Sequence, residues 1–343
     1  MKLISRGVPS TASSGDASAA NDSSYQTEWR SRGIPATLTY DLSSVPKQQR
    51  RTIYVVWYNN PTYGFDHSLL GAVGYNNPGS YSLQGNAAAG GGRPPESGWV
   101  TLASVNGNTF HSRDHVLDFA GYNWLRLDIT RSDGSPKNTD ASLNLDVYDA
   151  SNGVTDGWLF AGDSITAGGM GQADLSVGSQ SFTNQVGALT GVFPTQENAG
   201  MPGWTSADVE SHLPSWLQQF HGKYVTLSFG TNDAAGGMSP GTFYGNMSNL
   251  VRMILAAGKI PVIPTIPWSR DPTHARNIPG LNASIERLYG KFPAVVRGPD
   301  LYNYFRMNPD LISTDNVHPT QRGYAAARTQ WAAAAAKSIY ADR

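Results

Sequence analysis

The chain contains no cysteine, which excludes disulfide bonds, a thiolate nucleophile and a thiolate metal site. It also has little charge: Asp, Glu, Lys and Arg make up 15% of its 343 residues, against roughly 25% in average soluble proteins. The 25 basic and 26 acidic side chains nearly cancel. No long-range field therefore favours phosphates, and we do not expect nucleic acid as a partner.

Long hydrophobic runs are absent as well. No stretch reaches the 18 or so apolar residues that span a bilayer, so no membrane span is expected. The N-terminus lacks the apolar core of a signal peptide. We predict a secreted or periplasmic protein whose signal peptide is not visible in this chain, and the sequence leaves the oligomeric state open.

Neutral polar and aromatic residues take the place of charge. The chain has 37 Gly, 16 Tyr and 9 Trp, and 39% of its residues are hydrophobic. This composition suits a surface that stacks on sugars or other uncharged ligands, although an ordinary Gly-rich β protein has a similar one. The length predicts about two domains.

The first part of the chain reads as an all-β domain. Residues 1–24 are rich in Ser, Ala, Gly and Asp without a hydrophobic period, so a flexible leader is expected there. Residues 25–152 contain short runs rich in β-formers, namely TLTYDLS, RTIYVVWYNN, NWLRLDITRS and SLNLDVYDAS, separated by Gly, Pro and Asn clusters. This pattern predicts an antiparallel β-sandwich or jelly-roll accessory domain.

Residues 156–343 have a different pattern. The apolar strands GWLF, YVTLSF and KIPVIPTIPW each end in a polar turn, and helical segments lie between them. Strand, loop and helix in alternation predict an α/β domain with a parallel sheet flanked by helices. In such sheets, functional side chains gather in loops at the carboxyl ends of the strands.

The first such cluster is Gly162, Asp163 and Ser164, directly after the strand GWLF. A serine on a sharp strand-to-helix turn exposes its hydroxyl and points its backbone N–H toward a substrate carbonyl. The alternative is an Asp/Ser turn that only caps the next helix. Thr166 stands where a G-x-S-x-G elbow has its last glycine, which disfavours the ordinary α/β-hydrolase turn.

Two further loops contain candidate groups for substrate binding. Residues 198–204, NAGMPGW, contain glycines that permit close approach of backbone N–H groups to a ligand. Residues 230–233, GTND, follow a strand, and the Asn232 amide there can donate to a developing oxyanion. Simple turns are the alternative for both.

A serine nucleophile requires a base, and two Asp-x-x-His pairs offer one. Asp315 and His318 precede the last helical segment, and Asp271 and His274 repeat the spacing in SRDPTH. In either pair the carboxylate can fix the imidazole tautomer. The spacing alone does not choose between them.

Four clusters in chain order closely resemble the motifs of the SGNH (GDSL-type) hydrolases, over about residues 156–340. They are Gly-Asp-Ser at 162–164, Asn-x-Gly-x-x-Gly at 198–203, Gly-Thr-Asn-Asp at 230–233 and Asp-x-x-His-Pro at 315–319. This resemblance implies a three-layer fold and identifies Ser164 as nucleophile, with Asp315 and His318 completing the triad. It also implies an oxyanion hole built from the Ser164 and Gly203 N–H groups and the Asn232 side chain. Ile165 replaces the family's leucine.

The sequence therefore predicts a serine esterase that hydrolyses short-chain carboxylic esters, most simply O-acetyl groups on saccharides, through an acyl-serine intermediate. A β-sandwich before an SGNH domain is similar to the layout of certain carbohydrate esterases. No metal or organic cofactor is implied. Trp204 and Trp268 are candidate walls of a sugar or acyl pocket, or else packing residues. A lipase or arylesterase for apolar esters, and a carbohydrate-binding protein with an inactive hydrolase domain, are the alternatives.

Overall fold

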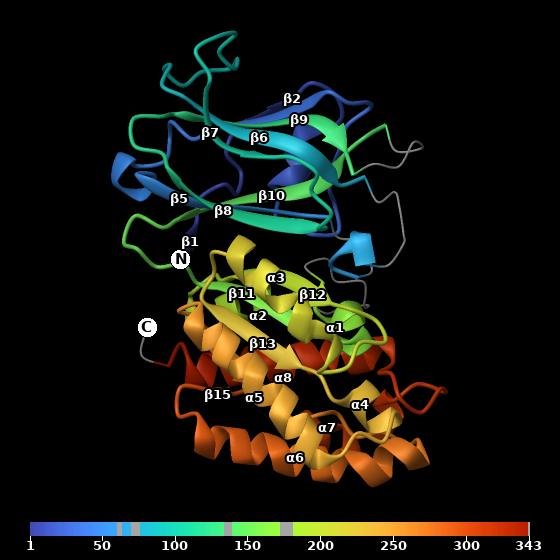
Figure 1. Ribbon diagram of the computed structural model, residues 1–343. Helices are drawn as coiled ribbons and strands as arrows, with labels where there is room; N and C mark the ends of the chain where they lie inside the picture. The colour runs from blue at the N-terminus through green and yellow to red at the C-terminus, as the bar shows by residue number, and fades with distance from the viewer. Residues whose placement is uncertain (60–63, 70–75, 134–138, 172–180, 342–343) are drawn as a thin grey trace. The chain divides into compact units, whose positions relative to one another are not determined.

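The computed structural model describes residues 1–59, 64–69, 76–133, 139–171 and 181–341 (Figure 1). The chain forms two compact units, Met1–Thr155 and Asp156–Arg343. Within the described ranges, no helix combines the length and the apolar character needed to cross a bilayer.

The first unit contains two antiparallel sheets, as the sequence predicted. One sheet has the order β1-β10-β5-β8, with β3 also paired to β10, and the other has the order β2-β4-β9-β6-β7. The strands of the first are β1 (Lys2–Leu3), β3 (Trp29–Arg30), β5 (Thr52–Tyr58), β8 (Ser112–Asp118) and β10 (Ser142–Asp149). Those of the second are β2 (Ser10–Ala12), β4 (Ala36–Asp41), β6 (Pro78–Asn86), β7 (Val100–Val105) and β9 (Trp124–Ser132).

The two-residue period of the strands builds the shared core of this unit. Ile53, Val55 and Trp57 alternate along β5 and point into one apolar cluster, and Leu125 and Leu127 of β9 enter it from the other sheet. Side chains that face each other between two sheets exclude water, so this cluster makes the unit a β-sandwich.

Residues 1–24 do not form a flexible leader, and this prediction is wrong. β1 pairs with β10 and β2 pairs with β4, so each adds an edge strand to a sheet. Ser5 is fully buried, and the Asn21 side chain donates to the Ser5 and Val8 carbonyls at 2.8 and 3.0 Å. Backbone pairing, a buried amide and the core contacts of Ile4, Ala17 and Ala20 hold the segment, and these apolar residues are too irregularly spaced to produce a hydrophobic period.

Deleting residues 1–24 should therefore lower the free energy of unfolding of the first unit. Two edge strands would lose their places, and β4 and β10 would expose backbone groups that are now paired. Asn21→Ala removes only the buried amide and should cost a smaller amount, about 1 to 3 kcal/mol. Urea unfolding followed by circular dichroism measures both. Superimposable curves for the deletion and the full chain would restore the leader interpretation.

The second unit has the α/β fold that the sequence predicted, with a parallel sheet of order β12-β11-β13-β14-β15. Its strands are β11 (Gly157–Gly162), β12 (Thr195–Gly200), β13 (Tyr224–Ser228), β14 (Ile260–Ile263) and β15 (Val296–Arg297). Its α-helices are α1 (Ser164–Gly169), α2 (Phe182–Thr190), α3 (Leu213–Gln219), α4 (Thr231–Ala235), α5 (Pro240–Ala256), α6 (Pro272–Lys291), α7 (Leu301–Met307) and α8 (Gln321–Ser338).

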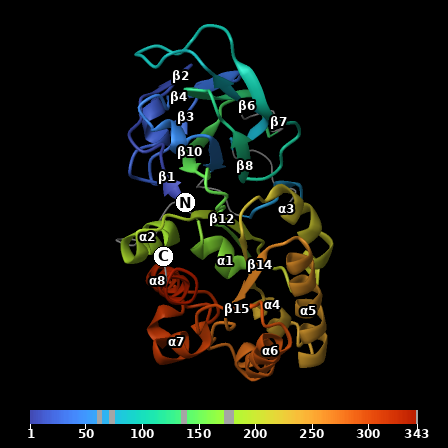
Figure 2. The ribbon, with the colours of Figure 1, turned by 90° about the vertical axis from the view of Figure 1, so that its left-hand side faces the viewer.

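Helices cover both faces of this sheet (Figure 2). On one face, Phe182 of α2 and Trp331 of α8 pack against Trp158 and Phe160 of β11. On the other, α5 lies against β13 and β14, with α3 and α6 beside it. The buried sheet leaves the loops at the carboxyl ends of its strands as the accessible place for chemistry.

Candidate active site

Strand register brings three of the predicted loops to one edge of the sheet. Gly162 at the end of β11 pairs with Gly200 of β12 on one side and Ser228 of β13 on the other. The loops that follow these three residues therefore leave the sheet at the same level. The Met201 N–H also donates to the Gly162 carbonyl at 2.8 Å, which ties the second loop to the first.

Asp163 and Ser164 form the turn between β11 and α1. The Asp163 carboxylate accepts the Ile165 N–H at 2.9 Å, and Ser164 is the first residue of the helix. The cap that was the alternative reading of this turn is thus present, and it fixes the backbone of the serine. The capping interaction and a functional serine are compatible, because they use different side chains.

Ser164, His318 and Asp315 form a continuous hydrogen-bonded row. The Ser164 hydroxyl lies 2.8 Å from His318 Nε2, and His318 Nδ1 lies 2.7 Å from Asp315 Oδ2. With Nδ1–H donated to the carboxylate, Nε2 presents a lone pair to the hydroxyl. This arrangement can take the proton of a serine as it attacks a carbonyl carbon.

A tight loop orients the carboxylate. Its other oxygen, Asp315 Oδ1, accepts the Val317 N–H and the His318 N–H at 2.9 Å each and the Ser313 hydroxyl at 2.7 Å. Desolvation opposes ionisation, but these bonds and that from His318 outweigh it and hold the pKa of Asp315 well below its ordinary value. The carboxylate is therefore charged wherever the histidine can act as a base.

Besides the Ser164 N–H, two candidate oxyanion donors lie on the other two loops. Gly203 adopts φ +80°, a conformation that favours glycine, and is exposed. Asn232 lies in the first turn of α4, and its Nδ2 donates to the Trp204 carbonyl at 2.8 Å, which leaves one amide N–H for a ligand. Gly200 is buried and its N–H donates to Asn198 Oδ1 at 3.0 Å, so it is unsuited to this task.

Asn198 links β12 to α1, a role that the sequence did not predict. Its Nδ2 donates to the Ala167 carbonyl in α1 at 2.9 Å while its Oδ1 accepts the Gly200 N–H. A Cβ on Gly200 would lie 2.2 Å from the Ala167 backbone nitrogen, so only glycine permits this contact. Asn198 and Gly200 thus fix α1, and with it Ser164, against β12. The Asn-x-Gly spacing was the available signal.

Burial raises the pKa of Asp163 to about 6, against hydrogen bonds from the Ile165 N–H and the Thr231 side chain that favour the charged form. The folded chain therefore binds this proton more tightly than the unfolded chain, where the pKa is near 3.8. The contribution of this bound proton to the free energy of unfolding is therefore complete at low pH and is lost as pH rises through about 6.

Asp163→Asn keeps a capping oxygen but cannot titrate. Its free energy of unfolding, relative to that of the unchanged chain, should therefore rise between pH 4 and 7, by up to about 3 kcal/mol. Urea unfolding at several pH values measures this difference. A difference that stays constant with pH would mean that Asp163 titrates normally.

The rival pair forms the same contact elsewhere. His274 Nδ1 lies 2.7 Å from Asp271 Oδ1, and that oxygen also accepts the Thr273 and His274 N–H groups, so Asp271 caps α6. Both Asp-x-x-His pairs therefore form a carboxylate–imidazole hydrogen bond. They differ in that the second ring nitrogen of His318 contacts Ser164.

The two tryptophans have different surroundings. Trp204 is partly exposed, and its ring stacks on that of Trp216 with centroids 5.8 Å apart and an angle of 11° between the planes. Trp268 packs against an apolar cluster that includes Leu301 and Phe305. Trp204 follows the candidate oxyanion donor directly, whereas Trp268 contributes to packing, and a substrate contact stays a prediction for both.

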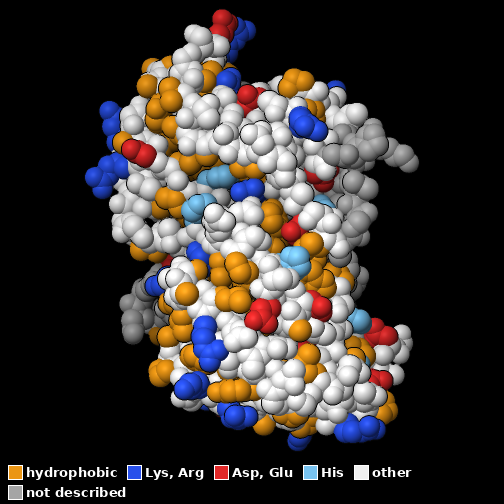
Figure 3. Space-filling model, viewed as in Figure 1, with side chains coloured by type: hydrophobic (Ala, Val, Ile, Leu, Met, Phe, Trp, Pro, Cys, Tyr) orange, Lys and Arg blue, Asp and Glu red, His pale blue; other side chains and the backbone are white. Residues whose placement is uncertain are grey.

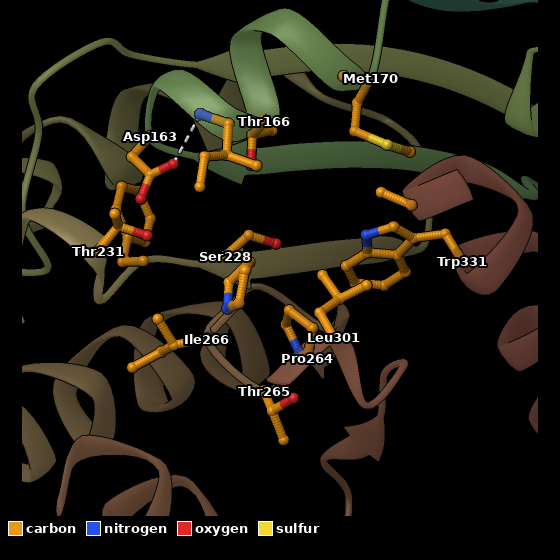
Figure 4. A pocket seen from close by; sticks show the side chains of 15 residues that line it. Asp163, Thr166, Met170, Ser228, Thr231, Pro264, Thr265, Ile266, Leu301 and Trp331 are labelled. Carbon is orange, nitrogen blue, oxygen red and sulfur yellow. Dashed lines mark hydrogen bonds between the residues drawn. The ribbon is translucent and has the colours of Figure 1, made fainter. Parts of the chain in front are cut away.

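A mostly apolar cavity lies beside the nucleophile turn (Figure 4). Asp163 and Ile165 flank Ser164 and line it, and Trp331 closes it from α8. Leu301 of α7 and Ala327 of α8 also line it. The other lining residues come from α1 and its C-cap, from the end of β13 and the start of α4, and from the segment after β14; they are Thr166, Gly169, Met170, Ser228, Phe229, Thr231, Pro264, Thr265, Ile266 and Pro267. In the described residues no three His, Asp or Glu side chains cluster as around a metal ion, so no metal site is assigned.

Residues 160–326 match the family model described as GDSL-like Lipase/Acylhydrolase. The second unit therefore belongs to this family, and the protein is a carboxylic ester hydrolase. No curated protein matches the chain.

Several solved structures are similar. A lipase/acylhydrolase from Enterococcus faecalis is 24% identical, with 52% of this chain and 94% of that chain covered and a TM-score of 0.43. The acetylxylan esterase Axe2 from Geobacillus stearothermophilus is 18% identical, with 54% and 94% covered and a TM-score of 0.42. A chitosan-binding module of a chitosanase/glucanase from Paenibacillus sp. IK-5 is 19% identical, with 43% and 98% covered and a TM-score of 0.32.

Proposed function

We propose that Ser164 is the nucleophile of this ester hydrolase, His318 its general base and acid, and Asp315 the group that orients His318. The observation that carries the proposal is the row Ser164 Oγ, His318 Nε2 and Asp315 Oδ2, with contacts of 2.8 and 2.7 Å. Its order matches the proton path that an activated serine requires.

The reaction proceeds in two halves. Ser164 Oγ attacks the ester carbonyl carbon while His318 Nε2 takes its proton, and the tetrahedral intermediate collapses as His318 returns that proton to the leaving alcohol. Water then attacks the acyl-Ser164 ester, with His318 again as base, and the carboxylic acid leaves. The Asp315 carboxylate stabilises the imidazolium at each step without taking the proton.

The negative oxygen of each tetrahedral intermediate requires donors placed in advance. We assign this role to the Ser164 and Gly203 N–H groups and to the Asn232 amide. The Asn232 contact with the Trp204 carbonyl at 2.8 Å supports this assignment, because it links the two loops and fixes the amide before substrate binds.

Asn232→Ala should lower kcat by about 10² to 10³ while KM changes little, as expected when one preorganised oxyanion donor is lost. Steady-state kinetics on 4-nitrophenyl acetate measure both constants. Asn303→Ala, in α7, is a matched control with kinetics like those of the unchanged enzyme. An Asn232→Ala effect confined to KM would identify Asn232 as a ground-state binding residue.

For the substrate we propose O-acetyl groups on saccharides. Neutral polar side chains and backbone make up most of the face in Figure 3, with charged side chains scattered over it. A weakly charged, aromatic-rich chain suits an uncharged polyhydroxyl ligand, and the partly exposed Trp204 ring beside Gly203 offers a stacking surface. A polymeric substrate of this kind is met outside the cytoplasm, which supports a secreted or periplasmic location.

Release of acetate from acetylated xylan and from acetylated monosaccharides, compared with hydrolysis of 4-nitrophenyl acetate, tests the substrate class. We expect kcat/KM on an acetylated saccharide to exceed that on the aryl ester, and Trp204→Ala to reduce the saccharide rate more than the aryl rate. Equal losses on both substrates would remove Trp204 from sugar recognition.

The cavity beside Ser164 favours a second candidate, an esterase for longer apolar acyl chains. Ile165, Met170 and Trp331 give it an apolar lining that suits such a chain. A series of 4-nitrophenyl esters from acetate to octanoate separates the candidates. Activity that rises with acyl-chain length would support the second candidate over the acetyl esterase. In that case Met170→Trp, which fills part of the cavity, should lower activity on the long-chain esters and leave activity on the acetate ester unchanged.

A further inference from the structure

A short segment before α6 contacts the loop that carries the candidate base. The Asn316 carbonyl, which lies between Asp315 and His318 in the chain, accepts the Ser269 hydroxyl at 2.7 Å and the Arg270 N–H at 2.9 Å. The Asp271 N–H approaches the same oxygen at 3.3 Å. Three consecutive residues thus direct donors at one carbonyl of the loop.

The Arg270 side chain contacts the same loop at its start. Its Nη2 donates to the Pro309 carbonyl at 2.9 Å and to the Ile312 carbonyl. Ile312 pairs with Pro319 in a short antiparallel bridge, and the Ser313 N–H donates to the His318 carbonyl at 2.8 Å. Residues 269–271 therefore fix both the base of this hairpin-like loop and its tip.

The loop requires these hydrogen bonds, because the side chains of Asp315 and His318 are not held in place by burial. The Asp315 side chain is 51% exposed and that of His318 is 39% exposed. Asn316 adopts φ +67°, a left-handed conformation that costs free energy for a residue with a Cβ. Donors on the Asn316 carbonyl stabilise the loop in this conformation.

The supporting segment is itself firmly anchored. Ser269 is 2% exposed, and its hydroxyl oxygen also accepts the Asp271 N–H at 3.0 Å. Asp271 is the N-cap of the 20-residue helix α6, and its hydrogen bond with His274 is the largest cause of its lowered pKa. The second Asp-x-x-His pair thus joins the segment to a long helix.

The geometry points to Ser269 and Arg270 as positioning residues that hold His318 and Asp315 in line with Ser164. The Asp271–His274 pair anchors them to α6. This inference rests on the proposed function of Ser164, His318 and Asp315. Loosening the loop should reduce the fraction of time in which His318 Nε2 faces the serine hydroxyl, and should leave substrate binding nearly unchanged.

Arg270→Gln is the main test, because Arg270 is exposed and its loss leaves no cavity. We expect kcat on 4-nitrophenyl acetate to fall about 10-fold with KM within twofold, and Arg270→Lys to recover part of the loss. Ser269→Ala should act in the same direction. Arg276→Gln, on the exposed side of α6, is the matched control and should retain the unchanged kcat.

The pH profile separates positioning from a general loss of structure. A looser Asp315 contact stabilises the imidazolium less, so the acid limb of kcat/KM in Arg270→Gln should move to lower pH. Partial unfolding would scale the profile without moving it. In a His318→Ala background, Arg270→Gln should cause no further loss, because its effect passes through His318.

The outcomes distinguish a failure of the positioning inference from a failure of the proposed function. If His318→Ala abolishes activity but Arg270→Gln and Ser269→Ala keep the unchanged kcat and pH profile, the positioning inference is wrong and the proposed function stands. A loss in Arg270→Gln that persists in the His318→Ala background also overturns the inference. Substantial activity in His318→Ala alone would instead overturn the proposed function.

Discussion

Replacing Ser164 with alanine should lower ester hydrolysis by on the order of 10⁴-fold or more. The hydroxyl supplies the attacking oxygen, and no acyl-enzyme can form without it. Folding should be unaffected, because Asp163, not Ser164, caps α1 through the Ile165 N–H. Initial rates on 4-nitrophenyl acetate and urea unfolding curves measure the two properties.

Ser239→Ala is the matched control for this substitution. Ser239 is exposed and caps α5 through the Thr242 N–H at 3.1 Å, so its loss should affect stability by about 1 kcal/mol and leave the rate unchanged. Full esterase activity in a properly folded Ser164→Ala enzyme would mean that another group attacks the ester.

His318→Ala should remove nearly as much activity as Ser164→Ala, on the order of 10⁴-fold or more, because the base and the nucleophile act as a unit. Asp315→Asn should cost less than His318→Ala, since the carboxylate orients the imidazole and stabilises its charge without taking the proton. His274→Ala should cost at most a few-fold, because its imidazole contacts Asp271 at the start of α6.

The double variant His274→Ala/His318→Ala makes the comparison stricter. It should be no less active than His318→Ala within the error of the assay, because only one histidine activates Ser164. The base assignment would fail if His274→Ala were inactive and His318→Ala active.

The edge of the parallel sheet was predictable because three apolar strands each end in a polar turn. Parallel strands bring such turns together, and β11 and β13 do so in register. β12 has the sequence TQENAG, which is not apolar, so it was not predicted, and residues 198–200 of the predicted loop form its end. The terminal helix was equally predictable from TQRGYAAARTQWAAAAAKSIY: Thr320 caps α8 through the Gly323 N–H, and the helix continues to Ser338.

The choice between the two histidines was not available from the residues alone. Asp271–His274 and Asp315–His318 have the same spacing and the same 2.7 Å contact. They differ in which imidazole has its second nitrogen beside Ser164, and that depends on the path of the chain over more than a hundred residues. Resemblance to a family pointed to His318, and the 2.8 Å contact with Ser164 supports it.

The leader was misread for a related reason. A hydrophobic period reports side chains that enter a core at regular spacing. Residues 1–24 are held by main-chain pairing of β1 and β2 with β10 and β4 and by a few irregularly spaced apolar residues such as Ile4 and Ala20. The surroundings of Trp268 were not predictable either, because a place near the end of a strand does not determine which way a side chain points, and the sequence left a pocket wall and packing open as alternatives. Trp268 packs against Leu301 and Phe305.

The most direct test that Ser164 is the nucleophile is covalent labelling with diethyl 4-nitrophenyl phosphate, followed by peptide mass spectrometry. We expect one diethylphosphoryl group, on Ser164, to form in step with the loss of esterase activity. Labelling should be absent in Ser164→Ala and at least 10³-fold slower in His318→Ala, because the base activates the same hydroxyl toward phosphorus. Complete inactivation with the label on any other residue would mean that Ser164 is not the nucleophile.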